Sequence, residues 1–76
     1  MSNTNTTKNT VEFIAVVVSS FAQKFGMSNA DAYKYMKQFG AMESIIRNYE
    51  GLHTQSIDDA VDFAVDVCRN HGGNLQ

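Results

Sequence analysis

From Val11 to Phe25 the chain contains no glycine, proline, asparagine or aspartate, and its apolar residues recur with helical spacing. They follow the i, i+3, i+4, i+7 pattern of one helix face. The valine run also has strand propensity, but about fifteen residues without a turn signal exceed a typical strand. We therefore predict a helix that begins at Asn9 or Thr10 and has these residues on its inner face: Val11, Ile14, Ala15, Val18, Phe21, Ala22 and Phe25.

Three further apolar residues of this helix, Phe13, Val16 and Val17, lie off that face. A helix that is apolar around most of its circumference is either central in a core or part of an interface between subunits. A domain this short buries only a modest fraction of its surface. We therefore expect these three residues to contribute to a homodimer interface.

The rest of the chain has the pattern of three shorter helices. Ser28 caps the first of these and Ser56 the last, and the one between them has an inner stripe that starts at Met42. Gly26, Gly40, Gly51 and the pair Gly72–Gly73 stand where helices should end. Proline, which breaks helices, is absent. The sequence predicts an all-α fold, a compact bundle of four helices with short links marked by glycine and serine. Residues 9–76 would form this single domain after a flexible polar tail, residues 1–8.

The inner faces of the three shorter helices follow from the same periodicity. The second helix, which ends near Phe39, and the third, from about Met42 to Glu50, each offer four inner positions, and the last helix offers six. The predicted inner residues are Ala32, Tyr33, Met36 and Phe39, then Met42, Ile45, Ile46 and Tyr49, then Ile57, Ala60, Val61, Ala64, Val65 and Cys68.

Composition limits the cellular compartment and the class of partner that we expect. The single cysteine, Cys68, cannot form an internal disulfide, and neither a signal-peptide core nor an apolar run long enough to cross a bilayer is visible, so we expect a cytoplasmic protein without membrane contact. The net charge of −2 disfavours nucleic-acid binding. Residues 1–40 have a balance of +2 and residues 41–76 a balance of −4, which makes the second half acidic.

Much of this acidity lies along the last predicted helix. Asp58, Asp62 and Asp66 are spaced by four residues and share a helix face, and Asp59 flanks them. We call these four residues the acidic stripe. Like charges at this spacing repel one another, so one interpretation is a docking surface for a partner protein with a basic surface. The other interpretation is a solvated face whose first two acids favour the helix N-terminus.

Other candidate residues carry weaker signals. His53 and Thr54 lie in a predicted connector, where they form a binding hotspot or simply satisfy backbone groups at helix ends. Cys68 and His71 share a helix face, but two ligands are too few for a structural metal site, and Cys68 falls on the apolar stripe. No nucleophile elbow, phosphate-binding loop or paired-histidine motif is present. The sequence therefore predicts no enzyme, no metal and no cofactor.

Several strings within residues 27–63 carry a resemblance. They are Met27–Ala30, Tyr35–Gly40, Ile45–Glu50 and Leu52–Asp59, and Tyr49, Leu52, His53 and Thr54 form the strongest signature. The chain resembles a family of short bacterial domains of unknown function, the one numbered three-seven-nine-one. Members are often encoded beside a toxin that looks like an ADP-ribosyltransferase, so the resemblance implies, by association, an antitoxin-like or accessory binding role.

These observations favour a small protein-binding module, antitoxin-like or accessory to a neighbouring toxin. The alternative is a DNA-binding regulator of the helix-turn-helix type, formed by the second and third predicted helices around Gly40. Its weakness is charge, because the third helix offers only one cation, Arg47.

Overall fold

A computed structural model describes the backbone of residues 4–75, and the side chains from residue 9 onward. Within this range the chain forms helices and no strand. The five helices are α1 (Thr4–Phe25), α2 (Asn29–Gln38), α3 (Ala41–Arg47), α4 (Tyr49–Leu52) and α5 (Ile57–Asn70). The predicted all-α fold class is confirmed, and so is the choice of helix over strand for the valine run, which lies inside α1.

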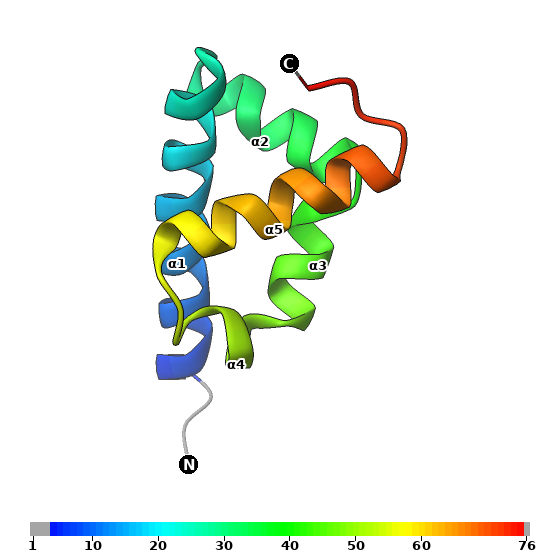
Figure 1. The fold of residues 1–76 in the computed structure, drawn as a ribbon. Helices are drawn as coiled ribbons and strands as arrows, with labels where there is room; N and C mark the ends of the chain where they lie inside the picture. Colours follow the sequence, from blue (N-terminus) through cyan, green and yellow to red (C-terminus); the bar gives the residue numbers. More distant parts are fainter. Residues whose placement is uncertain (1–3, 76) are drawn as a thin grey trace.

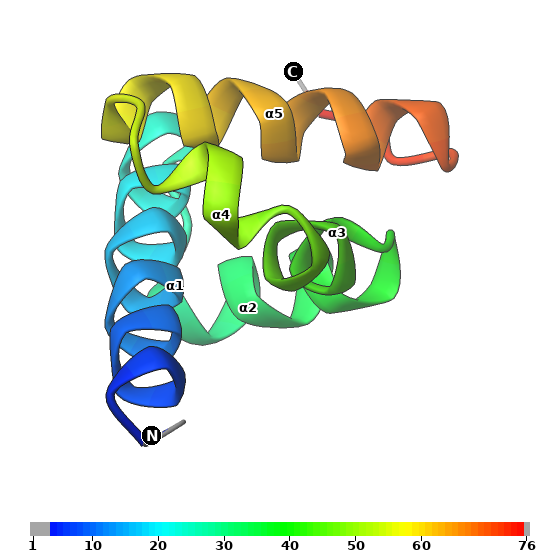
Figure 2. The same ribbon diagram turned by 90° about the horizontal axis from the view of Figure 1, so that it is seen from below.

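Helices α1, α2, α3 and α5 enclose one core, to which the short helix α4 contributes Leu52. The long helix α1 forms one side of the molecule, and α2, α3 and α5 lie against it (Figure 1). Viewed at a right angle to this, α5 lies across the group on the side opposite α2 (Figure 2). The buried apolar residues form one cluster: Val17, Val18, Phe21, Ala22, Ala32, Met36, Ala41, Met42, Ile45, Leu52, Ala60, Val61, Ala64, Val65 and Cys68.

The N-terminal limits of α2 and α5 were predicted correctly. The Ser28 hydroxyl accepts a hydrogen bond from the backbone N–H of Asp31 at 3.0 Å, and the Ser56 hydroxyl accepts one from Asp59 at 3.1 Å. Each serine therefore satisfies one of the free N–H groups in the first turn of a helix.

The start of α1 differs from the prediction. The helix begins at Thr4 instead of Asn9, so part of the predicted flexible tail is helical, and residues 1–3 lie outside the described residues. Asparagine, serine and threonine favour helix ends but do not break a helix, and no glycine or proline intervenes. Asn9 therefore does not mark the start of α1, because no residue before it prevents the helix from extending back to Thr4.

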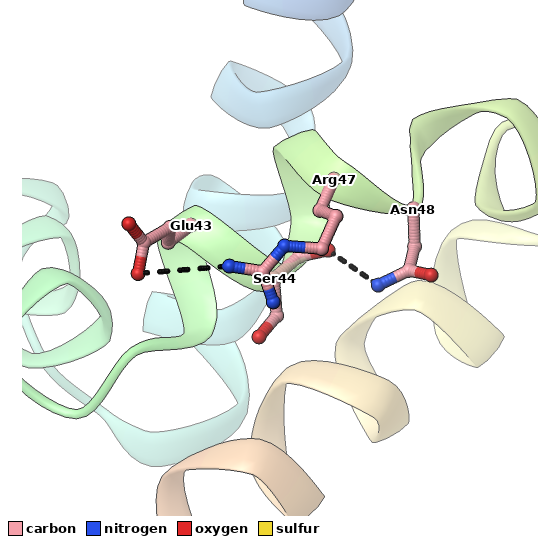
Figure 3. Close-up of polar contacts among 4 residues, drawn as sticks. All are labelled: Glu43, Ser44, Arg47 and Asn48. Atoms are coloured by element: carbon pink, nitrogen blue, oxygen red, sulfur yellow. Dashed lines mark hydrogen bonds and ion pairs between the residues drawn. The ribbon is translucent and has the colours of Figure 1, made fainter.

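The third predicted helix is divided in two. Asn48 separates α3 from α4, and its side-chain Nδ2 donates a hydrogen bond to the Ser44 carbonyl oxygen at 2.8 Å (Figure 3). The same carbonyl oxygen also accepts from the Asn48 backbone N–H at 3.0 Å. An asparagine side chain that bonds to nearby backbone groups in this way favours a helix end. Gly51, predicted to end the third helix, lies inside α4 instead.

Four of the predicted inner residues face solvent. On α1, Val11 is 59% exposed and Ala15 is exposed as well, since the buried residues of this helix start only at Val17. Tyr33 is 45% exposed and Ile46 is 53% exposed, while their neighbours Ala32 and Ile45 are buried completely. A helix of two or three turns can direct only a few positions at one core, and here the neighbouring positions take them. The prediction that Val11, Ala15, Tyr33 and Ile46 point inward is therefore wrong.

The C-terminal segment closes tightly over α2 and α5. The Gly73 backbone N–H donates to the Cys68 carbonyl oxygen at 2.7 Å, and a Cβ placed on Gly73 would lie 2.5 Å from the Tyr35 hydroxyl oxygen. That hydroxyl is buried and has no hydrogen-bond partner within the part of the chain that the structure describes. Gly73 is thus required for close packing.

We expect Gly73→Ala to lower the free energy of unfolding by about 1–3 kcal/mol, because the added methyl group overpacks the contact with Tyr35 and the Cys68 carbonyl. Urea denaturation measures this change, and faster hydrogen exchange at the residue 73 amide would locate it. Gly51→Ala is the control, since a Cβ there meets no atom within 4 Å. It should instead stabilise α4 by about 0.4–1 kcal/mol. Equal effects of both substitutions would contradict the assignment.

Candidate functional site

The acidic stripe occupies the outer face of α5. Asp58, Asp59, Asp62 and Asp66 are all exposed, while Ala60 and other residues on the opposite face of the helix enter the core. In the part of the chain that the structure describes, none of the four carboxylates forms an ion pair. The stripe is therefore a row of like charges at helical spacing that the described residues leave unpaired.

Helix stability explains only half of this row. Asp58 and Asp59 lie in the first turn of α5, where the positive end of the helix dipole stabilises negative charge. Asp62 lies beyond that turn, and Asp66 lies close to the C-terminal end, where the dipole disfavours an acid. The two later acids therefore gain nothing from the helix dipole and repel their neighbours in the stripe, so they are the part that calls for another explanation.

His53 and Thr54 satisfy carbonyl groups of α4. The His53 Nδ1 donates a hydrogen bond to the Tyr49 carbonyl oxygen at 2.8 Å, because a carbonyl can only accept. The Thr54 hydroxyl donates to the Gly51 carbonyl oxygen at 2.8 Å. The His53 ring also stacks on Tyr49 with its centroid 4.5 Å away and an interplanar angle of 12°. Both side chains therefore hold the end of α4, as the structural interpretation expected, and both remain exposed.

A shallow groove brings several predicted residues together. It lies where α4 meets α1 and the loop into α5 crosses α1 (Figures 1 and 2), and its volume is about 310 Å³. Phe13 meets Tyr49 edge to face, with ring centroids 5.5 Å apart. The groove is lined by Asn9, Glu12, Phe13 and Val16 of α1, by Tyr49 and His53, and by Ile57 at the start of α5. We call it the α1–α4–α5 groove.

The three residues predicted for a homodimer interface separate in the structure. Val17 is 0% exposed and belongs to the core of its own chain, so its assignment to an interface was wrong. The cause is that α5 and α2 cover more of α1 than one helical stripe suggested. Val16 is 47% exposed, and Phe13 is half-buried against α4. Only these two residues remain available to a partner.

A second groove connects the acidic stripe to α1. Asp58 and Asp62 line it together with Ser20, Gln23 and Lys24. Lys24 is the cation of this groove, but its ammonium group lies 6.0 Å from the centroid of the Phe25 ring and forms no ion pair among the described residues. The two aspartates therefore keep their charge exposed.

Helix α3, which would be the recognition helix of a DNA-binding regulator, has few groups that could contact DNA. Helix α3 has seven residues, and Arg47, its one cation, approaches Glu43 with 4.0 Å between Nη2 and Oε1 (Figure 3). A side chain shared with an acid one turn away contributes less to phosphate binding than a free one.

Cys68 and His71 have different surroundings. Cys68 is free and buried, whereas the His71 Nδ1 donates to the Val67 carbonyl oxygen at 2.8 Å. Among the described residues no three His, Cys, Asp or Glu side chains are placed to share a metal ion. Burial raises the pKa of the Cys68 thiol from 9.0 to about 11, because the thiolate is desolvated in the core. Cys68 is therefore an unreactive core residue at neutral pH.

This raised pKa has a consequence for stability. The folded chain keeps the Cys68 proton between pH 9 and 11, where the unfolded chain releases it. We therefore expect the free energy of unfolding to fall by up to about 2–3 kcal/mol as the pH rises through this window. Urea titrations across the window measure the fall, and Cys68→Ala is the control because alanine does not titrate. If both proteins lose stability with the same slope, the fall does not come from Cys68.

No single helix in the described part of the chain is both long and apolar enough to cross a membrane. Residues 9–25 and Asn29–Gln38 together reach the necessary length and composition only across a bend of 103°.

The groove residues Asn9, Glu12, Tyr49 and Ile57 were not predicted as site residues. Phe13 and Val16 gave a signal, since they are apolar and lie off the inner face of α1, but the sequence did not show which helix they would meet.

Comparison with known proteins gives a family. No curated protein and no solved structure matches the chain. The profile of DUF3791, described as a protein of unknown function, matches residues 12–71. This range includes the signature Tyr49, Leu52, His53 and Thr54 and the whole acidic stripe. It also includes every residue that lines the α1–α4–α5 groove except Asn9. The chain therefore belongs to the family DUF3791.

Proposed function

We propose that this chain is a small protein-binding module that docks a partner with a basic surface through the acidic stripe. The observation that carries the proposal is the state of Asp62 and Asp66. Both are exposed, neither has an ion pair among the described residues, and neither lies where the helix dipole would reward an acid. A cationic partner would remove the repulsion along the stripe and would be drawn to it from a distance.

We also propose an antitoxin-like or accessory role. Its support is the resemblance described above, which implies an ADP-ribosyltransferase-like toxin encoded nearby. The free, buried Cys68 is compatible with a reducing cytoplasm, which is where we place the protein.

The regulator alternative has less support. A recognition helix should present cations to phosphate and base edges, but α3 has Arg47 beside Glu43 and is otherwise apolar or polar without charge. The surface of α5 would also repel a phosphate backbone.

A tagged chain used as bait in lysate of the native host tests the proposal, with one half of each sample treated with nuclease and the bound material eluted by a salt gradient. We expect one stoichiometric protein with a basic surface that survives nuclease and elutes as the salt rises, since salt screens exposed charges. Recovery of nucleic acid, with protein lost after nuclease treatment, would favour the regulator. A partner that salt does not release would remove the acidic stripe from the explanation.

A further inference from the structure

One face of α1 joins the two grooves into a single surface. Glu12, Val16, Ser20 and Lys24 follow one another at four-residue steps, so they lie along one side of this helix. The first two line the α1–α4–α5 groove, and the last two line the groove of the acidic stripe. On α5, Ile57 lines the α1–α4–α5 groove, and the next residue, Asp58, lines the groove of the acidic stripe. An apolar hollow is thus continuous with an acidic edge.

The apolar end of this surface is rigid. Phe13 packs edge to face on Tyr49. His53 stacks on the same tyrosine, and its Nδ1 donates a hydrogen bond to the Tyr49 carbonyl oxygen. Val16 stands beside this row of rings and is 47% exposed. A wall of fixed rings next to an exposed valine resembles the pre-organised apolar centre of a protein interface more than an enclosed small-molecule site.

The acidic end has charges left to pair. Glu12 borders the apolar hollow, and Asp58 and Asp62 border its continuation. In the described part of the chain none of these three carboxylates forms an ion pair, and Lys24 is directed at the Phe25 ring. The surface therefore complements a segment that has apolar side chains on one side and cations beside them.

We propose that the α1–α4–α5 groove receives a basic amphipathic helix of the partner protein. A large apolar side chain of that helix packs against Val16, Phe13 and His53, while its lysines or arginines meet Glu12, Asp58 and Asp62. The inference rests on the proposed function, to which it adds the class of partner and a second part of the binding surface.

Charge distinguishes this occupant from a second copy of the chain. In a two-fold symmetric dimer the same patch of both chains meets. Glu12, Asp58 and Asp62 of both copies would then border one interface, and each chain carries a net charge of −2. Like charges brought together oppose association, whereas a cationic helix removes the repulsion.

Synthetic peptides of about 18 residues, or about five helical turns, provide the probe. The first peptide has leucine at helical spacing and lysine elsewhere. The second has the same composition in an order that gives no apolar face. The third is the first peptide with glutamate in place of lysine. Each is titrated into the ¹⁵N-labelled full chain at low salt. We expect the first peptide alone to bind with saturable shifts at the amides of Val16, His53 and Ile57.

Two matched variants assign the apolar contact. Val16→Ser should weaken binding of the first peptide by about tenfold, since an exposed valine is otherwise buried on binding. Val11→Ser is the control, because Val11 is also an exposed valine of α1, at 59%, but lines a groove against α2 instead. It should leave the affinity unchanged.

The outcomes separate the two proposals. If the first two peptides bind equally and shift only Asp62 and Asp66, the groove is not the site and the proposed function survives. If the glutamate peptide binds the groove equally well, or if neither lysine peptide binds anywhere on the chain, the groove inference is wrong, and in the second case the acidic stripe loses its role as well. Self-association of the free chain that Val16→Ser abolishes would give the groove to a second copy and overturn the inference.

Discussion

Phe21→Ala is expected to lower the free energy of unfolding by about 3–5 kcal/mol. Phe21 is 0% exposed, and its ring lies 5.0 Å from that of Phe25 and 6.2 Å from that of Tyr35, measured between centroids. It therefore links α1 to α2 at the centre of the core. Removal of the ring forfeits its burial and leaves a cavity that the short helices around it can close only in part.

For a chain of this length such a loss is severe. At about 0.05–0.15 kcal/mol per residue, the whole domain is stable by only about 4–11 kcal/mol. Thermal and urea denaturation followed by circular dichroism measures the change. Val11→Ala is the control, since Val11 is 59% exposed, and it should change stability by no more than about 0.5 kcal/mol. A loss below about 1 kcal/mol for Phe21→Ala would mean that Phe21 is not central to the core.

The predictable part of the fold rests on local interactions. Ser28 and Ser56 were predicted as caps because a serine bonds a backbone N–H three residues ahead, whatever the rest of the chain does. The inner face of α5 was likewise predictable, since its apolar residues keep one helical period over three turns.

The unpredicted part depends on neighbours. The helical period of α1 follows from its sequence. Which of its apolar residues are buried, such as Val17 and not Val11, depends on how far α2 and α5 wrap around that helix. In the same way, Tyr33 and Ile46 are apolar at suitable positions, and only the placement of the other helices leaves them at the surface. The break at Asn48 had a local signal in its side chain, which the apolar stripe of the third predicted helix outweighed.

The candidate site divides along the same line. The acidic stripe is an i, i+4 pattern within one helix, so the sequence was sufficient to place its acids on one face. The α1–α4–α5 groove unites Phe13 and Val16 with His53, residues far apart in the chain. The sequence marks Phe13 and Val16 as surplus apolar residues and His53 as a residue of a connector. The packing of α4 on α1 brings them together.

The replacement of three acids of the stripe should separate binding from stability. We expect the triple variant Asp58→Asn, Asp62→Asn, Asp66→Asn to bind the captured partner about a hundredfold more weakly, at about 1 kcal/mol for each lost charge contact. Stability should change little. Loss of two repulsive i, i+4 pairs contributes about 0.2–0.5 kcal/mol each, and this offsets the lost helix-dipole interaction of Asp58, about 0.3–1 kcal/mol.

A variant with the same change in net charge is the control. Asp31→Asn, Glu43→Gln and Glu50→Gln remove three exposed acids from α2, α3 and α4 and leave the stripe intact. Isothermal titration at low and high salt compares the two triple variants with the unchanged chain. We expect only the stripe variant to lose affinity and the dependence of affinity on salt, because screening acts on the charges that contact the partner. If the control weakens binding as much, the partner responds to the overall charge of −2 and not to α5.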